Sequence, residues 1–586
     1  MPAAKKFTAK TSSLPAPIGG WNARDSLAQM APTDAVTLTN WFPTPTDVTL
    51  RKGFTKYSQG ITGEVQSLMN YAGPSSQKLF AVANGVIYDC NTSTATSVFT
   101  GLSNSKFQHV NVTTAGGHFL IACNGSDATM IYDGTAWFKV ATTTTAQTIS
   151  SITNSTTTAT LTTASAHGLV TGNRVTISGA TASAYNGTFV ITVTGTTTFT
   201  YTMLSNPGGS ASVVGTYSVI GITGVSSSTF INVNLFKQRL YFTENNTLKC
   251  WYLDVNSIGG AAVALDFGGI ARNGGFLQAM GTWTLDAGQG ADDYAVFVTN
   301  MGEVIVYNGT DPTSATTWAL KGVWQLGQTF NRRCFFKWSG DLLLLTQDGL
   351  VPLASALQSS RLDPRVNLTD KIFFAVSQAA TLYYDNFGWQ VNYFASENML
   401  ILNVPITGGT QQFVMHTITK SWANFTGIGA TCFEASGKAG MYFGANGYVG
   451  KFFDGTSDDG SNITATSQQA YSYFDTPGQL KRFTMVRPIL QSSGGVPGVF
   501  CGLSIDFDTQ SQLGAVSFNP SALGTGDWDS AVWDDAIWAG GLTTTKIWQG
   551  VTGIGFAASI NLNVAAQNIE LHWASTDYVM EAGGVL

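Results

Sequence analysis

A short β-hairpin pattern recurs along this chain and limits what it can fold into. Its clearest copy is Met441 to Gly455, MYFGANGYVGKFFDG. We expect two strands there, Met441 to Phe443 and Tyr448 to Phe453, because the Asn-Gly pair between them supplies the positive φ angles of a tight turn. One hairpin cannot bury its own apolar face. A fold that packs many hairpins together is therefore required.

Similar units occur at six other places: Leu79 to Asp89, Phe119 to Gly134, Leu240 to Asp254, Tyr294 to Gly309, Leu342 to Leu353 and, in looser form, Trp389 to Val404. The seven turns fall at Asn84, Asn124, Asn245, Met301, Asp348, Glu397 and Asn446. They are spaced by roughly 40, 121, 56, 47, 49 and 49 residues, against about 40 to 50 per blade in propeller repeats. The spacing predicts an all-β fold with a β-propeller of about six to seven blades.

The long interval between Asn124 and Asn245 contains a stretch of different composition, Thr142 to Thr216. This stretch is crowded with Thr, Ser and Gly, and Arg174 is its only charged residue. Subtracting its roughly 70 residues restores the blade period. Valine, isoleucine and aromatic residues alternate with Thr or Ser inside it, and Tyr185-Asn186-Gly187 marks a turn. We therefore expect an inserted module, a small β-barrel or sandwich.

The two ends of the chain differ from the repeats. Leu14 to Tyr57 is punctuated by proline, carries the large aromatics Trp21, Trp41 and Phe42 among others, and has a possible short helix at Pro32 to Leu38. We expect it to clamp the propeller or a partner. A second helix is predicted at Thr369 to Ala380, with Thr369 as N-cap. The alternation after Ser461 is typical of a β-sandwich. The expected domains are an N-terminal arm and clamp (1–60), the first part of the propeller (61–141), the insert (142–216), the second part of the propeller (217–460) and a C-terminal sandwich (461–586).

Charged residues make up 11% of the 586 residues, well below the usual figure of about 25%. The net charge is −6 and the pI about 5.4, so the whole molecule should not attract nucleic acid strongly. Three basic pairs, Arg51-Lys52, Arg332-Arg333 and Lys481-Arg482, are either solvated loop charges or contacts to phosphates in a channel. We name Arg332, Arg333, Lys481 and Arg482 as candidates for facing such a lumen.

The six cysteines are scattered and have no metal-ligand spacing, which suits buried free thiols in a reducing cytoplasm. The basic N-terminus is not followed by the apolar stretch of a secretory signal, and no apolar run reaches 18 residues. We therefore expect no membrane insertion.

Patterns of catalytic chemistry are scarce. The sequence has no nucleophile elbow, phosphate loop or His-Glu-x-x-His pattern, and its five histidines stand apart. We therefore expect no enzyme activity, cofactor or metal. Two acidic groups leave alternatives open: Asp454, Asp458 and Asp459 could form a cation loop. Asp527, Asp529, Asp534 and Asp535 could act on a sugar stacked on the nearby tryptophans, or could simply be turns and packing.

The segment Gly19 to Phe54 resembles the opening of the tail nozzle family of short-tailed bacteriophages, also called tail tubular protein B. The resemblance is carried by Gly19-Gly20-Trp21-Asn22, Pro32-x-Asp34-Ala35, Leu38-x-Asn40-Trp41-Phe42-Pro43 and Arg51-x-Gly53-Phe54. The insert, with Ala166-His167-Gly168-Leu169, Ile177-Ser178-Gly179 and Tyr185 to Phe189, is similar to a β module that recurs in phage tail proteins.

This resemblance implies a structural virion protein, assembled in the host cytoplasm, that forms a homohexameric ring below the tail adaptor. Double-stranded DNA would leave through the lumen, and the insert or a neighbouring domain would dock tail fibres. Two alternatives are a receptor-binding or fibre protein of the same tail and a propeller enzyme that acts on host surface polysaccharide. Candidate interface residues are Trp21, Trp41, Phe42, Arg174, Tyr185, Trp528, Trp533 and Trp538.

Overall fold

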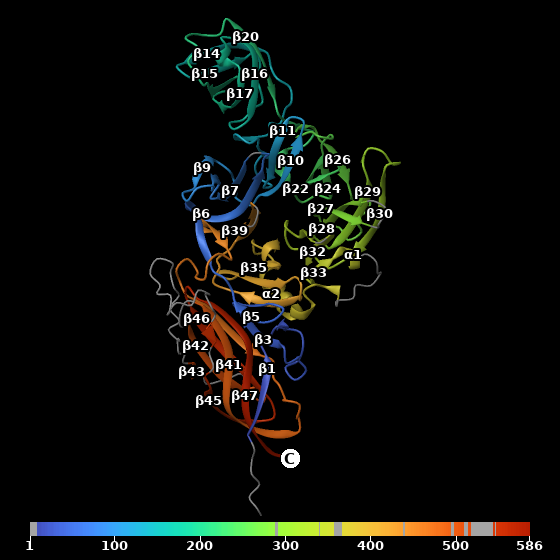
Figure 1. Cartoon of the computed structure of the whole chain (residues 1–586). Coiled ribbons are helices and arrows are strands. Elements are labelled where there is room, and N and C mark those ends of the chain that lie inside the picture. Colours follow the sequence, from blue (N-terminus) through green and yellow to red (C-terminus); the bar gives the residue numbers. More distant parts are fainter. Residues whose placement is uncertain are drawn as a thin grey trace, which may run out of the picture. The chain divides into compact units, whose positions relative to one another are not determined.

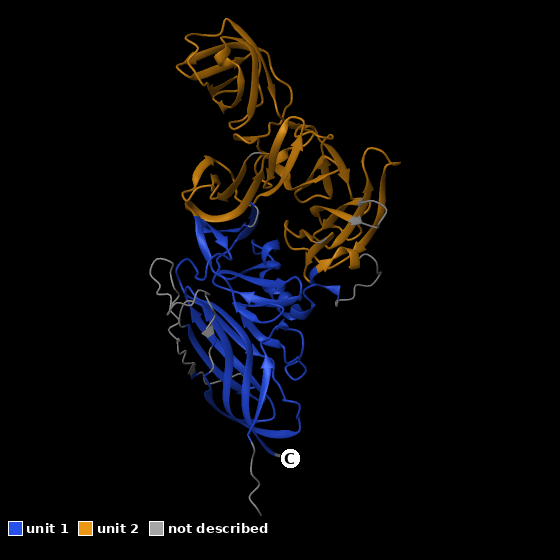
Figure 2. Ribbon diagram, viewed as in Figure 1, with its two compact units in different colours: residues 1–57, 348–350, 364–586 blue, residues 58–347, 351–363 orange. Residues whose placement is uncertain are grey.

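The computed structural model describes residues 9–74, 76–286, 291–338, 340–356, 366–437, 440–493, 497–508, 514–516, 543–544 and 547–585. The fold is all-β, with 57% strand and 5% helix, and contains a β-propeller (Figure 1). The chain divides into two compact units (Figure 2). Unit 1 contains residues 1–57, 348–350 and 364–586, and unit 2 contains residues 58–347 and 351–363.

Unit 2 carries consecutive antiparallel sheets, each formed by strands that follow one another along the chain. The first sheet continues from β6 (Phe54–Ala72), which begins in unit 1, through β7 (Gln77–Ala83), β8 (Val86–Asp89) and β9 (Thr96–Phe99). The second contains β10 (Gln108–Thr114), β11 (Gly117–Cys123), β12 (Met130–Tyr132) and β13 (Trp137–Lys139). The third contains β22 (Phe230–Phe236), β23 (Arg239–Glu244), β24 (Lys249–Tyr252) and β26 (Val263–Asp266).

The fourth sheet contains β27 (Leu277–Asp286), β28 (Ala291–Thr299), β29 (Glu303–Gly309) and β30 (Trp318–Gln325). The fifth contains β31 (Phe335–Trp338), β32 (Asp341–Thr346) and β33 (Gly349–Pro352), followed by α1 (Leu353–Ala356). A sixth set of four consecutive strands, in unit 1, contains β34 (Gln390–Phe394), β35 (Met399–Ile406), β36 (Gly409–His416) and β37 (Ser421–Phe425). Strand β37 joins this set to β3 (Asp34–Thr39) within a ten-stranded sheet.

Six of the seven predicted hairpins are confirmed, as the pairs β7–β8, β11–β12, β23–β24, β28–β29, β32–β33 and β34–β35. The turn between β7 and β8 shows why the local signal works. Asn84 and Gly85 both take positive φ, 47° and 71°, as a two-residue hairpin turn requires.

The seventh predicted hairpin, Met441 to Gly455, lies within one assigned strand, β39 (Gly440–Phe452), which pairs with β38 (Cys432–Ser436). The chain nevertheless folds back inside it: a Cβ on Gly450 would lie 2.3 Å from the Phe443 ring, and the Phe443 and Tyr448 rings are 6.2 Å apart. Of the predicted turn pair, Gly447 takes a positive φ of 87° and Asn446 does not, as in a type II turn. Strand β39 packs beside the start of β6 through the Phe54 and Phe443 rings, 5.2 Å apart. Strands β38 and β39 join the sheet of β6 to β9, so six blade sheets are present in the described part of the chain, within the predicted range of six to seven.

The insert has a core of its own within unit 2. One sheet contains β14 (Ile149–Ser155), β15 (Thr158–Thr163), β18 (Thr192–Val193) and β19 (Thr198–Thr202). The other contains β16 (Arg174–Thr181), β17 (Gly187–Val190) and β20 (Val213–Val219). Val175 and Ile177 are buried while Thr176 and Ser178 are exposed. The alternation of apolar residues with Thr or Ser thus places a small two-sheet module where the composition predicted one.

The sandwich of unit 1 is built from both ends of the chain. One sheet contains β3 (Asp34–Thr39), β40 (Ile463–Gln469), β46 (Ala558–Ala566), β42 (Gly498–Ile505) and β43 (Gly514–Val516), with β2 (Gly20–Trp21) beside β3. The other contains β4 (Trp41–Pro43), β5 (Val48–Leu50), β47 (Glu570–Val585), β41 (Gln479–Ser493) and β44 (Thr543–Thr544), with β1 (Ala9–Pro15) and β45 (Gln549–Gly555) alongside. The N-terminal segment therefore completes the sandwich of its own chain.

The two helix predictions have different outcomes. Residues Pro32 to Leu38 contain the start of strand β3, so the predicted helix there is wrong: β3 finds a pairing partner in β40, some 430 residues later. The second helix is present as the 3₁₀ turn η4 (Asp370–Ile372) followed by α2 (Phe373–Tyr383). Thr369 does not cap it, because its hydroxyl accepts a hydrogen bond from the Leu350 N–H at 3.1 Å.

Candidate functional site

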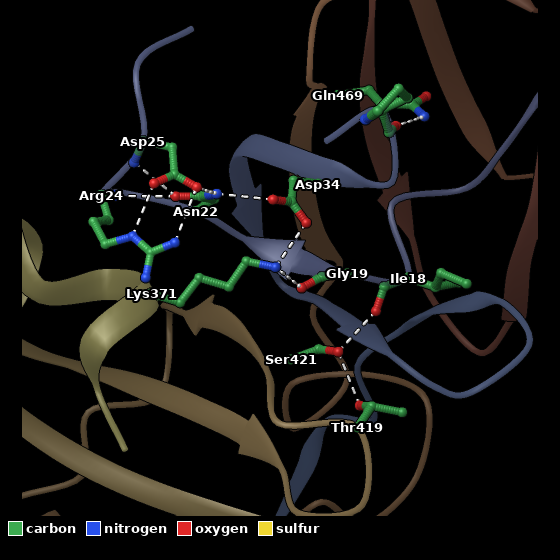
Figure 3. A network of polar contacts seen from close by, with 11 residues as sticks. Ile18, Gly19, Asn22, Arg24, Asp25, Asp34, Lys371, Thr419, Ser421 and Gln469 are labelled. Carbon is green, nitrogen blue, oxygen red and sulfur yellow. Dashed lines mark hydrogen bonds and ion pairs between the residues drawn. The ribbon is translucent and has the colours of Figure 1, made fainter. Parts of the chain in front are cut away.

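The residues that carry the family resemblance form two polar networks in unit 1. In the first, the Asn22 amide donates to Asp34 at 2.8 Å and to Asp25 at 2.9 Å. Lys371 Nζ donates to the other oxygen of Asp34 and to the Gly19 carbonyl, both at 2.7 Å (Figure 3). Asp34 is 5% exposed, so its charge is compensated where water cannot reach it. The network ties the N-terminal loop to η4.

The rim of this network is open to water. Arg24 forms ion pairs with Asp25 and with Asp370 of η4, and its side chain is 41% exposed. The hydrogen bonds from Arg24 and Asn22 hold the pKa of Asp25 below its usual range. Exposed pairs of this kind contribute less than about 1 kcal/mol, so the buried Asp34 contacts carry most of the attachment.

The second network surrounds Arg51, which is 1% exposed. Its two terminal nitrogens donate to the two oxygens of Asp458 at 2.7 and 2.6 Å, and its Nε donates to Asn40 at 2.9 Å. The remaining donors reach the carbonyls of Lys52 and Thr426. All five donors of the guanidinium are thereby used. The N-terminal segment is locked to the 458 loop and to the end of β37.

Two glycines of the resemblance are required by close packing. Gly20 has a φ of 81°, and a Cβ placed on it would lie 2.6 Å from the Trp422 carbonyl oxygen. A Cβ on Gly53 would lie 1.8 Å from the Ser457 carbonyl oxygen. Any side chain at either position would force the backbone apart.

The predicted interface residues lie in different settings. Trp41 (0% exposed) and Phe42 (5%) belong to the sandwich core, where the Trp41 and Trp573 rings are 6.0 Å apart. Tyr185 (0%) lies in the core of the insert. These three predictions need correction, since the side chains are buried in the cores of their own chain and are not available to a partner. Trp21 is half-buried, with its ring edge-on to Phe413.

Arg174, the only charged residue of the insert, faces the second blade. It forms an ion pair with Asp133 and lies over the Phe138 ring at 4.9 Å. The Asn173 amide adds a hydrogen bond to the Lys139 carbonyl at 2.9 Å. Arg174 thus attaches the module to its own chain. Trp528, Trp533 and Trp538 lie outside the described residues, as do Asp527, Asp529, Asp534 and Asp535.

Arg332 and Arg333, predicted to face a lumen, point into unit 2. Arg332 donates to the Asn124 carbonyl at 3.0 Å, and burial lowers its pKa. Arg333 donates to the Gln66 carbonyl and Ser67 hydroxyl at 3.1 Å and to the Phe107 carbonyl at 3.3 Å. The prediction of phosphate contacts here is corrected, because these donors hold together segments of the first and second blades.

Lys481 and Arg482 have opposite surroundings because neighbouring residues of a strand point to opposite faces. Lys481 is 2% exposed and donates to the carbonyls of Thr476, Gln479 and Phe556. Burial lowers its pKa, so it is not a surface cation, and this prediction is also corrected. The Arg482 side chain is 63% exposed, and its Nη1 lies 3.5 Å from Oε2 of Glu581.

The three aspartates of the possible cation loop do not converge on one point. Asp458 binds Arg51, Asp459 binds Lys56 at 2.7 Å, and Asp454 binds Lys451 at 2.8 Å. Among the described residues, no three His, Cys, Asp or Glu side chains gather as metal ligands would. The six cysteines are buried and none forms a disulfide bond, and burial raises the pKa of Cys90 and Cys334 to about 12. No helix in the described part of the chain is long and apolar enough to span a membrane.

One charged cluster was missed from the sequence. His572 lies between Asp47, with Nδ1 to Oδ2 at 2.7 Å, and Glu570, with Nε2 to Oε1 at 3.1 Å. The hydrogen bond to Asp47 raises the pKa of His572. The i, i+2 spacing of Glu570 and His572 on a strand was a usable signal, because it places both on one face. Asp47 lies 525 residues before His572, and no sequence pattern connects the two.

Comparisons with known proteins add little to this geometry. No protein-family model matches the sequence, and no curated protein matches it. Similar solved structures include the computationally designed protein Ika8 (10% identity, 68% of this chain and 99% of that one, TM-score 0.32). Another is Sqt1 of Saccharomyces cerevisiae, with 10% identity, 68% of this chain and 98% of that one covered, and a TM-score of 0.33. A third is the β-propeller domain of Cps50 (Swd1) from Myceliophteria thermophila, with 7% identity, 68% of this chain and 98% of that one covered, and a TM-score of 0.26. At these TM-scores the likeness carries no argument about what the chain does.

Proposed function

We propose that this chain is a non-enzymatic structural protein of the virion, the tail nozzle of a short-tailed bacteriophage. Six copies form a ring below the tail adaptor, double-stranded DNA leaves through its lumen without sequence-specific binding, and tail fibres dock on its side. Assembly takes place in the host cytoplasm. The six buried thiols suit that reducing compartment.

The observation that carries the proposal is the role of the residues behind the resemblance. Asn22, Asp34, Asn40, Arg51 and Gly53 all hold the N-terminal segment inside the sandwich. A motif whose residues make buried hydrogen bonds and close contacts specifies an architecture and not a reaction. Its resemblance to nozzle proteins therefore supports a shared scaffold, which is what a tail ring requires.

The fate of the basic residues gives further support. Three of the four proposed lumen cations donate to carbonyls of their own chain, and Arg482 remains largely exposed. Each Lys or Arg contact to phosphate adds affinity through counterion release. A conduit with few free cations retains a passing duplex less.

Labelled particles can test this proposal. Leu204, in the insert, is fully exposed, whereas all six native cysteines are buried. Phage carrying Leu204→Cys, treated with maleimide-linked gold and imaged by electron microscopy, should show gold around the tail. Wild-type particles should stay unlabelled and serve as the matched control.

The purified wild-type chain provides a second readout. Cryo-electron microscopy should show rings with six-fold rotational symmetry. Gold on the capsid shell, or a trimeric fibre in place of a ring, would overturn the proposal.

A further inference from the structure

A pocket of about 340 Å³ lies within unit 1, at one end of the sandwich. Its apolar lining comes from Phe42, Leu50, Phe453 and Ile569, each between 5% and 8% exposed. Its polar lining includes Lys52, Glu397, His416 and Glu570. The volume lies at the lower end of the range for small-ligand pockets, about 300 to 1,000 Å³.

His416 presents an unused donor to this pocket. Its ring is 5% exposed, and its Nδ1 accepts a hydrogen bond from the Thr419 N–H at 3.3 Å, with the Thr419 hydroxyl at 3.1 Å. Burial lowers the pKa of His416, so the ring is neutral at pH 7 with its proton on Nε2. No partner for this Nε2–H exists among the described residues. His416 Nε2 is not one of the buried side-chain atoms that lack a partner, so it is open to water in the pocket, and a bound acceptor would take the place of that water.

Each charged side chain that lines the pocket already has an ion-pair partner in the chain. Lys52 pairs with Glu397 at 2.9 Å, Glu570 with His572 at 3.1 Å, and Arg51 with Asp458. A charged ligand would have to break one of these pairs or enter without a counterion. An uncharged ligand avoids both costs.

The aromatic rings leave no open platform for a flat sugar or base. Lys52 Nζ lies over the Phe453 ring at 5.2 Å, and Phe425 stacks parallel to the same ring at 6.4 Å. Phe42 packs against His416, Phe425 and Phe453. Their exposed edges form an apolar floor suited to an aliphatic side chain.

We infer that this pocket binds an uncharged stretch of polypeptide from a partner protein. One aliphatic side chain of the partner fills the floor, and its backbone carbonyl accepts the hydrogen bond from His416 Nε2–H. Ser396, Asn398 and Thr456 also line the pocket, and hydroxyl and amide groups of this kind can bind peptide N–H and C=O groups. This inference does not depend on the ring or the phage assignment.

The test uses the full chain labelled with ¹³C at its isoleucine methyl groups, so that Ile569 reports on the pocket by NMR. The probe is N-acetyl-L-leucine methylamide. It should shift the Ile569 methyl signal in a saturable way. Free leucine and N-acetyl-leucine, which carry charges at the same positions, should bind at least about ten-fold more weakly.

Two substitutions of His416 form a matched pair. His416→Gln keeps an amide donor near the position of Nε2 and should bind the probe within about threefold of wild type. His416→Asn keeps a polar group toward Thr419 but loses that donor, and should bind about five-fold more weakly. Ser396→Trp, at an exposed rim position, should block the pocket without disturbing the fold, which the other isoleucine signals would verify.

Three results would overturn the inference: an Ile569 signal that the probe does not shift, equal affinity of wild type and Ser396→Trp, or an Ile569 shift produced by methyl glucoside and not by the peptide probe.

Discussion

Arg51 and Asp458, 407 residues apart in the chain, form a two-pronged ion pair with nitrogen to oxygen distances of 2.7 and 2.6 Å. The side chain of Arg51 is 1% exposed and that of Asp458 is 13% exposed. Because Arg51 has no water to solvate it, its charge depends on this carboxylate. The pair holds the N-terminal segment against the loop that follows β39, and so helps to join the two ends of the chain in one sandwich.

We predict that Asp458→Asn destabilises unit 1 by about 3 to 5 kcal/mol, since it leaves a buried charge uncompensated. Urea unfolding followed by tryptophan fluorescence would measure the loss. Asp459→Asn is the matched control, because Asp459 pairs with Lys56 at the surface and its loss should cost less than about 1 kcal/mol. Equal effects of the two substitutions would contradict the structural role of Asp458.

Arg333 gives a second prediction, for unit 2. Its guanidinium reaches Gln66, Ser67 and Phe107, so Arg333→Met should remove charge-assisted hydrogen bonds and cost about 2 to 4 kcal/mol. Thermal unfolding would measure this loss of stability. Arg482→Met, at an exposed position, should change stability by less than about 0.5 kcal/mol. If Arg333→Met had the same thermal stability as wild type, these contacts would not hold the blades together.

The blades were predictable because their signal is local. At Asn84 and Gly85 the residues that make the turn are neighbours in sequence, and the flanking strands need only each other. The same dipeptide at Asn446 and Gly447 also makes a turn, with a positive φ at Gly447 alone. The two sides of this turn are in close contact, because a Cβ on Gly450 would lie 2.3 Å from the Phe443 ring.

The site residues were less predictable, because the surroundings that decide their roles are distant in the sequence. Charge and spacing identified Arg332, Arg333 and Lys481 as cations. The carbonyl partners of the two arginines, and Phe556 beside Lys481, come from elements that no local pattern connects to them. Trp41 and Tyr185 are large aromatics that could equally serve an interface or a core. Only the folded chain decides between the two, by placing Trp573 beside Trp41 and sheets on both sides of Tyr185.

The cluster of His572, Asp47 and Glu570 predicts a pH dependence. Asp47, and then Glu570, raise the pKa of His572 above its usual value near 6.5. A group whose pKa is raised by folding contributes stability that is complete below the unfolded pKa and is lost as the pH rises through the folded pKa. Wild-type protein should therefore lose stability relative to His572→Gln as the pH rises from about 6.5 through the folded pKa.

Denaturant unfolding at several pH values would measure this difference, and an NMR titration of His572 should give a pKa above 6.5. Asp47 acts in the opposite direction at low pH. Its pKa is lowered, first by the His572 hydrogen bond, so its contribution is lost as the pH falls through the folded pKa. A constant difference between wild type and His572→Gln across this range would refute the prediction.

The insert supplies the last prediction, which concerns where it can be cut. The Ala141 N–H donates to the Ile220 carbonyl at 3.0 Å, and the Ile222 N–H donates to the Ala141 carbonyl at 2.9 Å, so the chain enters and leaves the module at neighbouring points. Replacing residues 142–220 with a short linker should leave unit 2 folded, as judged by circular dichroism and the thermal transition. A deletion that stops at Thr216 keeps Tyr217, which is 5% exposed in the module core, and should aggregate because that ring loses its packing. Global unfolding of the 142–220 replacement would show instead that the module is a necessary part of unit 2.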